Sequence, residues 1–143
     1  MTDFGFYLVI TNPVVGYAKC AEAAVRAGVK IVQLRMKHAS REEIIREARE
    51  MRRVTAGTGT LFIVNDDPAI AVEAEADGVH VGQGDMPPSE VRSRFPELRI
   101  VGLSTHNLRQ VEASRAEPIA SLPNQETLTS HLYKPTHSEE TPQ

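Results

Sequence analysis

The sequence has little of what marks secreted, membrane-spanning or nucleic-acid-binding proteins. Cys20 is its one cysteine, which excludes an internal disulfide framework and is typical of a reducing compartment. No cationic segment followed by an apolar one stands at the start, and no apolar run is long enough to span a bilayer. The net charge of −3 provides no basic excess for nucleic acid or an anionic membrane. We therefore expect a cytoplasmic globular protein without nucleic-acid or membrane partners.

Strand-like and helix-like segments alternate along most of the 143 residues, a length that suits one domain with a real core. The expected strands cover residues 6–11, 31–35, 61–65, 78–81 and 99–104. An Ala-rich helix is expected over 17–27, before Gly28 as a natural stop. Ser40 and Glu43 form a capping box that opens a second helix, and Pro68 suits the first turn of a third.

Strands that are apolar on both faces and alternate with helices predict a parallel sheet covered by helices. A doubly wound sheet and a (β/α) barrel both fit this pattern. No Gly-x-Gly-x-x-Gly follows the first strand, where the turn is residues 12–16, so a Rossmann dinucleotide site has no support. A complete TIM barrel has eight βα units in about 200 to 250 residues, whereas about five units are expected here.

The pattern changes near Glu117. The segment 117–143 contains four of the nine prolines, several Ser and Thr, and no apolar periodicity. Such a segment cannot bury enough apolar surface to offset the entropy lost on ordering. We expect one α/β domain over residues 1–116, with a last helix at 108–116, and an irregular, disordered tail over 117–143. The abrupt change leads to the hypothesis that a frameshift or a natural truncation produced this tail.

Polar residues gather where the expected strands end, which is where parallel barrels carry their active sites. Gln33, Arg35 and Lys37 alternate onto one face at the end of the second strand. An amide, a guanidinium and an ammonium there form a cradle for a phosphorylated substrate, or else a solvated strand end.

Carboxylates follow the third and fourth strands. Asp66 and Asp85 are candidates to hold Mg²⁺ jointly, because this ion prefers oxygen ligands that include one or two carboxylates. The alternative is that Asp66 or Asp67 caps the next helix and that Asp85 belongs to a turn.

The fifth expected strand ends in Ser104, Thr105 and His106. The hydroxyl pair can bind phosphate or cap the next helix, and His106 is a candidate general acid or base or a structural residue. His80, inside the fourth strand, is interpreted as a packed core residue or as a support for the site. No His and Cys stand at zinc spacing, and Cys20 is interpreted as a small buried residue.

Four motifs stand in the same order at the expected strand ends. They are Gln33-Leu34-Arg35 with Lys37, Val64-Asn65-Asp66, residues 76–83 with Asp85, and residues 102–106. Together they resemble the thiamine-phosphate synthase family over about residues 5–116. The resemblance implies a (β/α)8 TIM-barrel type fold, truncated here to about five βα units.

The resemblance also implies a transferase of thiamine biosynthesis. This enzyme joins 4-amino-5-hydroxymethyl-2-methylpyrimidine diphosphate to thiazole phosphate and releases diphosphate, which is thought to leave first. By matching position, Asp66 and Asp85 would be the Mg²⁺ ligands. The implied contacts to the pyrimidine diphosphate are Gln33, Arg35, Lys37, Asn65 and Ser104. The catalytic residues among them would be Arg35, Lys37 and Ser104.

The chain departs from the family pattern in two places. Asp67 stands where the family often has Arg. The family's sixth to eighth strands, with the backbone amides that bind thiazole phosphate, have no counterpart after residue 116, and residues 133–136 are no substitute. We therefore expect the second-substrate site to be missing and the activity of this chain alone to be in question.

Two other functions remain open. A related thiazole tautomerase shares the barrel and uses a His near the position of His106, although it generally lacks the Asp pair. The other alternative is that the chain is not an enzyme: it is an inactive remnant, or a half-barrel that forms homo-oligomers through its exposed barrel edges.

Overall fold

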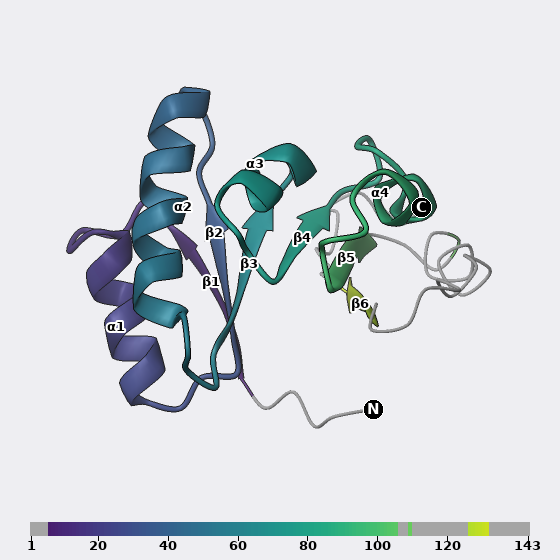
Figure 1. Cartoon of the computed structure of the whole chain (residues 1–143). Helices are drawn as coiled ribbons and strands as arrows, with labels where there is room; N and C mark the ends of the chain where they lie inside the picture. The colour runs from purple at the N-terminus through teal and green to yellow at the C-terminus, as the bar shows by residue number, and fades with distance from the viewer. Residues whose placement is uncertain (1–5, 106–108, 110–125, 132–143) are drawn as a thin grey trace, which may run out of the picture.

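Helices and strands alternate along the chain in the computed structural model, which describes residues 6–105, residue 109 and residues 126–131 (Figure 1). The elements are β1 (Tyr7–Thr11), α1 (Tyr17–Arg26), β2 (Ile31–Arg35), α2 (Arg41–Thr55), β3 (Leu61–Asn65), α3 (Pro68–Glu73), β4 (Gly78–Val81), α4 (Pro88–Arg94), β5 (Ile100–Thr105) and β6 (Glu126–His131). No helix within these ranges is both long and apolar enough to cross a membrane.

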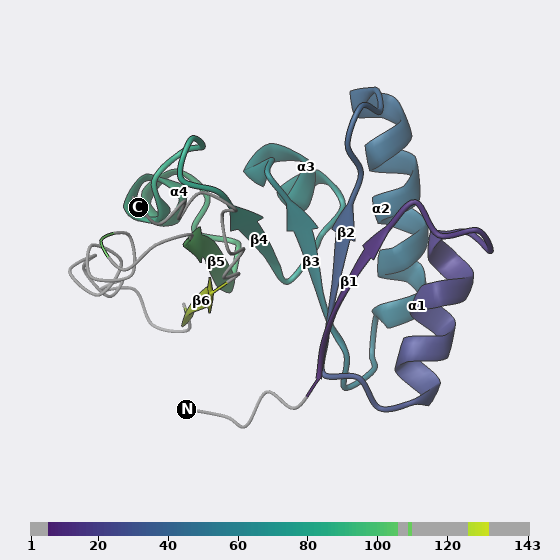
Figure 2. The ribbon, with the colours of Figure 1, turned by 180° about the vertical axis from the view of Figure 1, so that it is seen from behind.

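The strands form one parallel sheet in the order β1-β2-β3-β4-β5-β6. Helices α1 and α2 pack against each other on one face of the sheet (Figure 1). Figure 2 shows the opposite face, where no helix of the described residues covers β1 to β3. We call this second face the inner face. The α/β fold with parallel strands matches the prediction from the sequence.

Alternation along the strands separates two groups of buried side chains. The helix-side core includes Leu34, Val64 and Val81 and receives the apolar sides of the helices. The inner face carries a smaller cluster made by Ile31, Ile63 and Ile100, against which Tyr7 and Leu61 pack. Because side chains of one strand alternate between faces, the polar residues two and four positions further along also belong to the inner face.

The second helix follows the start signal that the sequence predicts. Ser40 is its N-cap, and the Ser40 hydroxyl oxygen accepts a hydrogen bond from the backbone N–H of Glu43 at 3.2 Å. Acidic residues fill the first turn and basic ones the last, which complements the helix dipole. One side of this helix buries Ile45, Ala48 and Met51 against the sheet.

Two elements were not expected. Helix α4 begins with Pro88 in its first turn and buries Val91, but it is too short to give a clear apolar period. Strand β6 lies within the segment expected to be irregular, and the structure differs from that expectation at residues 126–131. The sequence of β6 has one apolar residue, Leu128, so it shows no apolar pattern that predicts a strand. The strand is instead defined by its parallel pairing with the edge of β5.

Other expectations fall on residues that the structure does not describe. Of the helix expected over 108–116, only Arg109 lies within the described residues. Most of the segment 117–143 also lies outside them. The domain boundary near residue 116 therefore stays a prediction.

Asp77 ties three strands together at their amino ends. Its carboxylate oxygen Oδ2 accepts the backbone N–H of Phe62 at 2.7 Å and lies 3.4 Å from the Arg52 guanidinium. Its backbone carbonyl accepts the N–H groups of Arg99 and Ile100 at 3.0 and 3.1 Å. Asp77 thus connects β3, β4 and β5 at the starts of these strands.

We predict that Asp77→Ala lowers the free energy of unfolding by about 1–3 kcal/mol, because the buried N–H of Phe62 loses its acceptor. Urea denaturation followed by circular dichroism measures this change. Glu75→Ala, an exposed carboxylate two residues away, is the matched control and should shift the midpoint little. Equal midpoints for the two variants would contradict this role of Asp77.

Candidate functional site

Parallel pairing brings the predicted site residues to one edge of the sheet. Strand β2 carries Gln33 and Arg35, β3 ends at Asn65, and β5 carries Ser104 near its end. In the register of the sheet, Asn65 is level with His80 on β4. The carboxyl ends of β2, β3 and β4 lie along the same edge in Figure 1.

Lys37 and Asp66 meet across this edge. Lys37 Nζ lies 2.5 Å from Asp66 Oδ2, and the two side chains are 40% and 43% exposed. The sequence predicted that Gln33, Arg35 and Lys37 share one face of the strand. Strand β2 ends at Arg35, however, so Lys37 lies in the segment after the strand. The charged partner that Lys37 finds on the next strand end was not foreseen.

The backbone of Asp66 has a left-handed conformation, with φ at 72°, which is uncommon outside glycine. Its N–H donates to the carbonyl of His80 at 2.7 Å, so β4 holds this turn in place. Aspartate is one of the few residues besides glycine that adopt this conformation readily. This turn places the Asp66 carboxylate beside Lys37.

The neighbouring Asp67 has a different role. Its Oδ1 accepts the backbone N–H groups of Ala69 and Ile70 at 2.9 and 3.2 Å, which makes it the N-cap of α3. Of the two aspartates that the sequence offered as helix caps, Asp67 therefore takes that role. Asp66 remains available to the strand-end site.

Asp85 belongs to the turn after β4, as one interpretation of the sequence held. Its Oδ2 accepts the N–H of Gly82 at 2.7 Å, and its own N–H donates to the Gly82 carbonyl at 3.2 Å. The turn holds the carboxylate close enough to His80 to affect its ionisation, as does Asp66. The negative charges of both aspartates therefore favour the protonated form of His80.

His80 is buried on the inner face, with 6% of its surface exposed. Its Nε2 lies 2.5 Å from Ser104 Oγ on the next strand. Burial lowers the pKa of His80, and the negative charges of Asp66 and Asp85 act in the opposite direction. Gln83 Nε2 donates to the Ser104 carbonyl at 2.9 Å, so two side chains from β4 and its loop fix the end of β5.

Gln33 is also buried, at 3% exposed, and its Nε2 donates to the Tyr7 hydroxyl at 2.8 Å. Burial raises the pKa of Tyr7, while the hydrogen bond from Gln33 lowers it. Sequence reasoning missed Tyr7, although a phenol at the start of an apolar strand is a signal that a polar partner lies nearby. The phenol fixes one end of the Gln33 amide.

The structure brings some predicted residues together and leaves others apart. Lys37 contacts Asp66, and Ser104 contacts His80. Arg35 and Asn65 are half-buried at the same edge of the sheet. His106 lies outside the described residues.

The donor set fits Mg²⁺ better than a transition metal. Among the described residues, no group of three or more His, Cys, Asp and Glu side chains could hold a metal ion. Mg²⁺ does not need such a cage, because it is usually held by one or two carboxylates together with water and substrate phosphates. Asp66 and Asp85 can supply that number of carboxylates.

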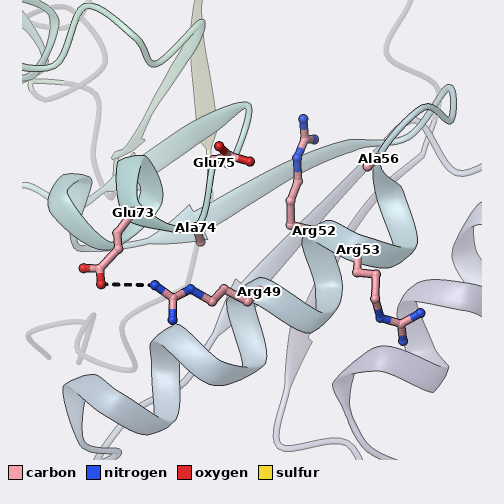
Figure 3. Close-up of a pocket in the computed structure, with 7 residues that line it drawn as sticks. All are labelled: Arg49, Arg52, Arg53, Ala56, Glu73, Ala74 and Glu75. Carbon is pink, nitrogen blue, oxygen red and sulfur yellow. Dashed lines mark hydrogen bonds and ion pairs between the residues drawn. The ribbon is translucent and has the colours of Figure 1, made fainter.

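A groove on the helical side is a different kind of feature (Figure 3). Residues Arg49, Arg52, Arg53, Ala56, Glu73, Ala74 and Glu75 line it. Arg49 pairs with Glu73 at 3.4 Å, while Arg52 and Arg53 point in other directions. The arginines do not converge on one point, so this groove does not resemble a phosphate site.

Comparisons with known proteins agree with the fold. The family model described as "Thiamine monophosphate synthase" matches residues 6–123. Thiamine-phosphate synthase from Shouchella clausii is 44% identical over 96 residues, which are 67% of this chain and 45% of that protein. The one from Synechococcus sp. is 39% identical over 111 residues, 78% of this chain and 32% of that protein.

A solved structure shows the same fold. The thiamine phosphate pyrophosphorylase from Pyrococcus furiosus superposes with a TM-score of 0.66 at 29% identity, over 78% of this chain and 55% of that one. This confirms the α/β barrel-type fold expected from the sequence. The chain spans 32% to 54% of the length of the curated relatives from Synechococcus, Shouchella, Clostridioides and Methanococcus. Since the family model matches most of its length, the chain belongs to the thiamine monophosphate synthase family.

Proposed function

We propose that this chain acts in thiamine biosynthesis as a thiamine-phosphate synthase. In this reaction 4-amino-5-hydroxymethyl-2-methylpyrimidine diphosphate and thiazole phosphate give thiamine phosphate and diphosphate. The observation that carries the proposal is the paired Lys37 and Asp66, which lie at one sheet edge with His80 and Ser104. The family membership supports the same reaction class, a transfer of a pyrimidine group.

The role proposed for the described strands is to bind the pyrimidine diphosphate. A diphosphate needs cations and hydrogen-bond donors, which Arg35, Lys37 and Ser104 provide. Asn65 can donate from its amide to a phosphate oxygen. Gln33, held by Tyr7 on the inner face, is assigned to the pyrimidine ring.

Asp66 and Asp85 are proposed to hold Mg²⁺, which when bound neutralises part of the negative charge of the diphosphate. The departing diphosphate gains negative charge as its bond to the pyrimidine methylene breaks. Arg35 and Lys37 would lie near that charge in fixed positions, which favours the transition state over the ground state.

The ion pair between Lys37 and Asp66 does not oppose this role. Both side chains are about half exposed, and such pairs contribute only about 0–1 kcal/mol. Lys37 can therefore exchange Asp66 for a diphosphate oxygen at little cost. Before the substrate binds, the ion pair balances the charges of Lys37 and Asp66.

The tautomerase alternative rests on His106, whereas the synthase proposal rests on the carboxylates Asp66 and Asp85 at the carboxyl ends of β3 and β4. The site residues proposed here serve the first substrate, the pyrimidine diphosphate. The free cysteine Cys20 and the phosphorylated substrates support a cytoplasmic location as part of the proposal.

Self-association is the second part of the proposal, with another copy of this chain as the partner. In the described sheet, β1 pairs only with β2, and Phe6 and Val9 beside this edge are 65% and 45% exposed. An open strand edge next to exposed apolar side chains favours pairing with another chain.

Replacing Val9 with Lys should weaken self-association, because a charge on an edge strand opposes pairing. Sedimentation velocity over a range of protein concentrations measures the effect. Val14→Lys, in the loop after β1, is the matched control for added charge at an exposed valine. A wild-type protein that stays monomeric at all concentrations would contradict this part of the proposal.

Asp85→Asn should weaken the binding of the pyrimidine diphosphate in the presence of Mg²⁺ by roughly tenfold or more, because one anionic ligand is lost. Isothermal titration calorimetry with and without Mg²⁺ measures it. Asp67→Asn is the matched control, because that side chain caps α3 and asparagine caps a helix about as well as aspartate does; it should leave both the stability and the affinity nearly unchanged. Unchanged affinity in Asp85→Asn would remove Asp85 from the site.

Arg35→Gln should also weaken binding of the pyrimidine diphosphate and reduce its dependence on salt, because one cation facing the diphosphate is removed. The same titration at two salt concentrations measures both quantities. Arg46→Gln removes an exposed charge from α2 and serves as the control. If both variants bind alike, Arg35 has no special role in the cradle.

A further inference from the structure

The contact between His80 and Ser104 is built into the inner face of the sheet. His80 is 6% exposed, and its Nε2 approaches Ser104 Oγ to 2.5 Å. The ring lies against Gly102, where a Cβ atom would collide with Nδ1 of His80. Glycine at position 102 therefore makes room for the imidazole, and the ring reaches the hydroxyl two residues further along β5.

The direction of this hydrogen bond decides what Ser104 can do. A serine hydroxyl has one hydrogen to donate and two lone pairs to accept with. If Ser104 donates to His80, it has no hydrogen left for an anion. If Nε2 of His80 carries the hydrogen and donates, the hydroxyl hydrogen of Ser104 is available.

A diphosphate oxygen can only accept a hydrogen bond. The role of Ser104 as a diphosphate contact therefore requires His80 to carry hydrogen on Nε2. This requirement holds whether the ring is neutral or protonated, because Nε2 is a donor in both cases. Gln83 holds the backbone carbonyl of Ser104, whereas the hydroxyl hydrogen of Ser104 can still rotate toward a ligand.

We propose that His80 is a positioning residue: its Nε2–H donates to Ser104 Oγ and leaves the Ser104 hydroxyl hydrogen to bind an oxygen of the substrate diphosphate. The inference rests on the proposed function, since it assumes that a diphosphate binds at this strand end. It adds a specific role for a buried histidine that does not itself touch the substrate.

A double-mutant cycle on the full chain tests this role, with inorganic pyrophosphate and Mg²⁺ as the probe in isothermal titration calorimetry. Ser104→Ala and His80→Phe should each weaken binding by roughly ten- to hundredfold, the range for a hydrogen bond to a charged group. The double variant should bind no more weakly than Ser104→Ala alone. His80→Gln keeps an N–H donor and should therefore bind pyrophosphate more tightly than His80→Phe does. Additive effects would overturn the inference.

Val79→Ala is the matched control for a change in stability alone. Val79 lies next to His80 on β4, but its side chain is buried in the helix-side core. Its loss should lower the melting temperature and leave pyrophosphate affinity unchanged. If Val79→Ala weakens binding as much as His80→Phe does, the effect of His80 is one of general stability and the inference fails.

The tautomer of His80 gives a readout that needs no ligand. Long-range ¹H–¹⁵N spectra of the chain, with the His80 signals assigned by their absence in His80→Gln, distinguish hydrogen on Nε2 from hydrogen on Nδ1. We expect hydrogen on Nε2, and hydrogen on Nδ1 alone would overturn the inference. Wild-type protein that does not bind pyrophosphate would instead contradict the proposed function, so the two failures are distinguishable.

Discussion

Parallel pairing of consecutive strands is the constraint on which the rest of this molecule depends. Each strand pairs with the next one in the sequence, and all run the same way. No helix of the described residues covers the inner face over β1 to β3. From β1 to β5, helices α1 to α4 provide the return path between consecutive strands. As a result, residues far apart in the sequence, such as Lys37, Asp66 and Ser104, reach one edge of one sheet.

The aspartates show how the fold divides similar side chains between structure and function. Asp77 accepts a backbone N–H at the amino ends of the strands, and Asp67 caps a helix, so both carboxylates satisfy groups that would otherwise be left without an acceptor. Asp66 and Asp85 follow the carboxyl ends of β3 and β4, and Asp66 pairs with Lys37. Hydrogen bonds to backbone groups thus distinguish Asp77 and Asp67 from Asp66, whose carboxylate pairs with a side chain.

Much of the fold could be predicted from the sequence, because apolar strand runs and a capping box are local signals. The five expected strands agree with β1 to β5 to within a residue at either end. Helix α4 and strand β6 were missed, since one is too short for a period and the other depends on the edge of β5. Local pattern also could not tell which of Asp66 and Asp67 caps α3, because that depends on a left-handed backbone at Asp66. The contact of His80 with Ser104 depends on strand register and on space at Gly102, which no local pattern shows.

The central claim is that the carboxyl edge of this sheet binds a pyrimidine diphosphate together with Mg²⁺. Titration of the full wild-type chain with 4-amino-5-hydroxymethyl-2-methylpyrimidine diphosphate, with Mg²⁺ and then with a chelator, tests it most directly. The account predicts saturable binding at one site per chain that is lost when the metal is removed. Absence of binding by folded protein, or binding that is the same without Mg²⁺, would contradict it.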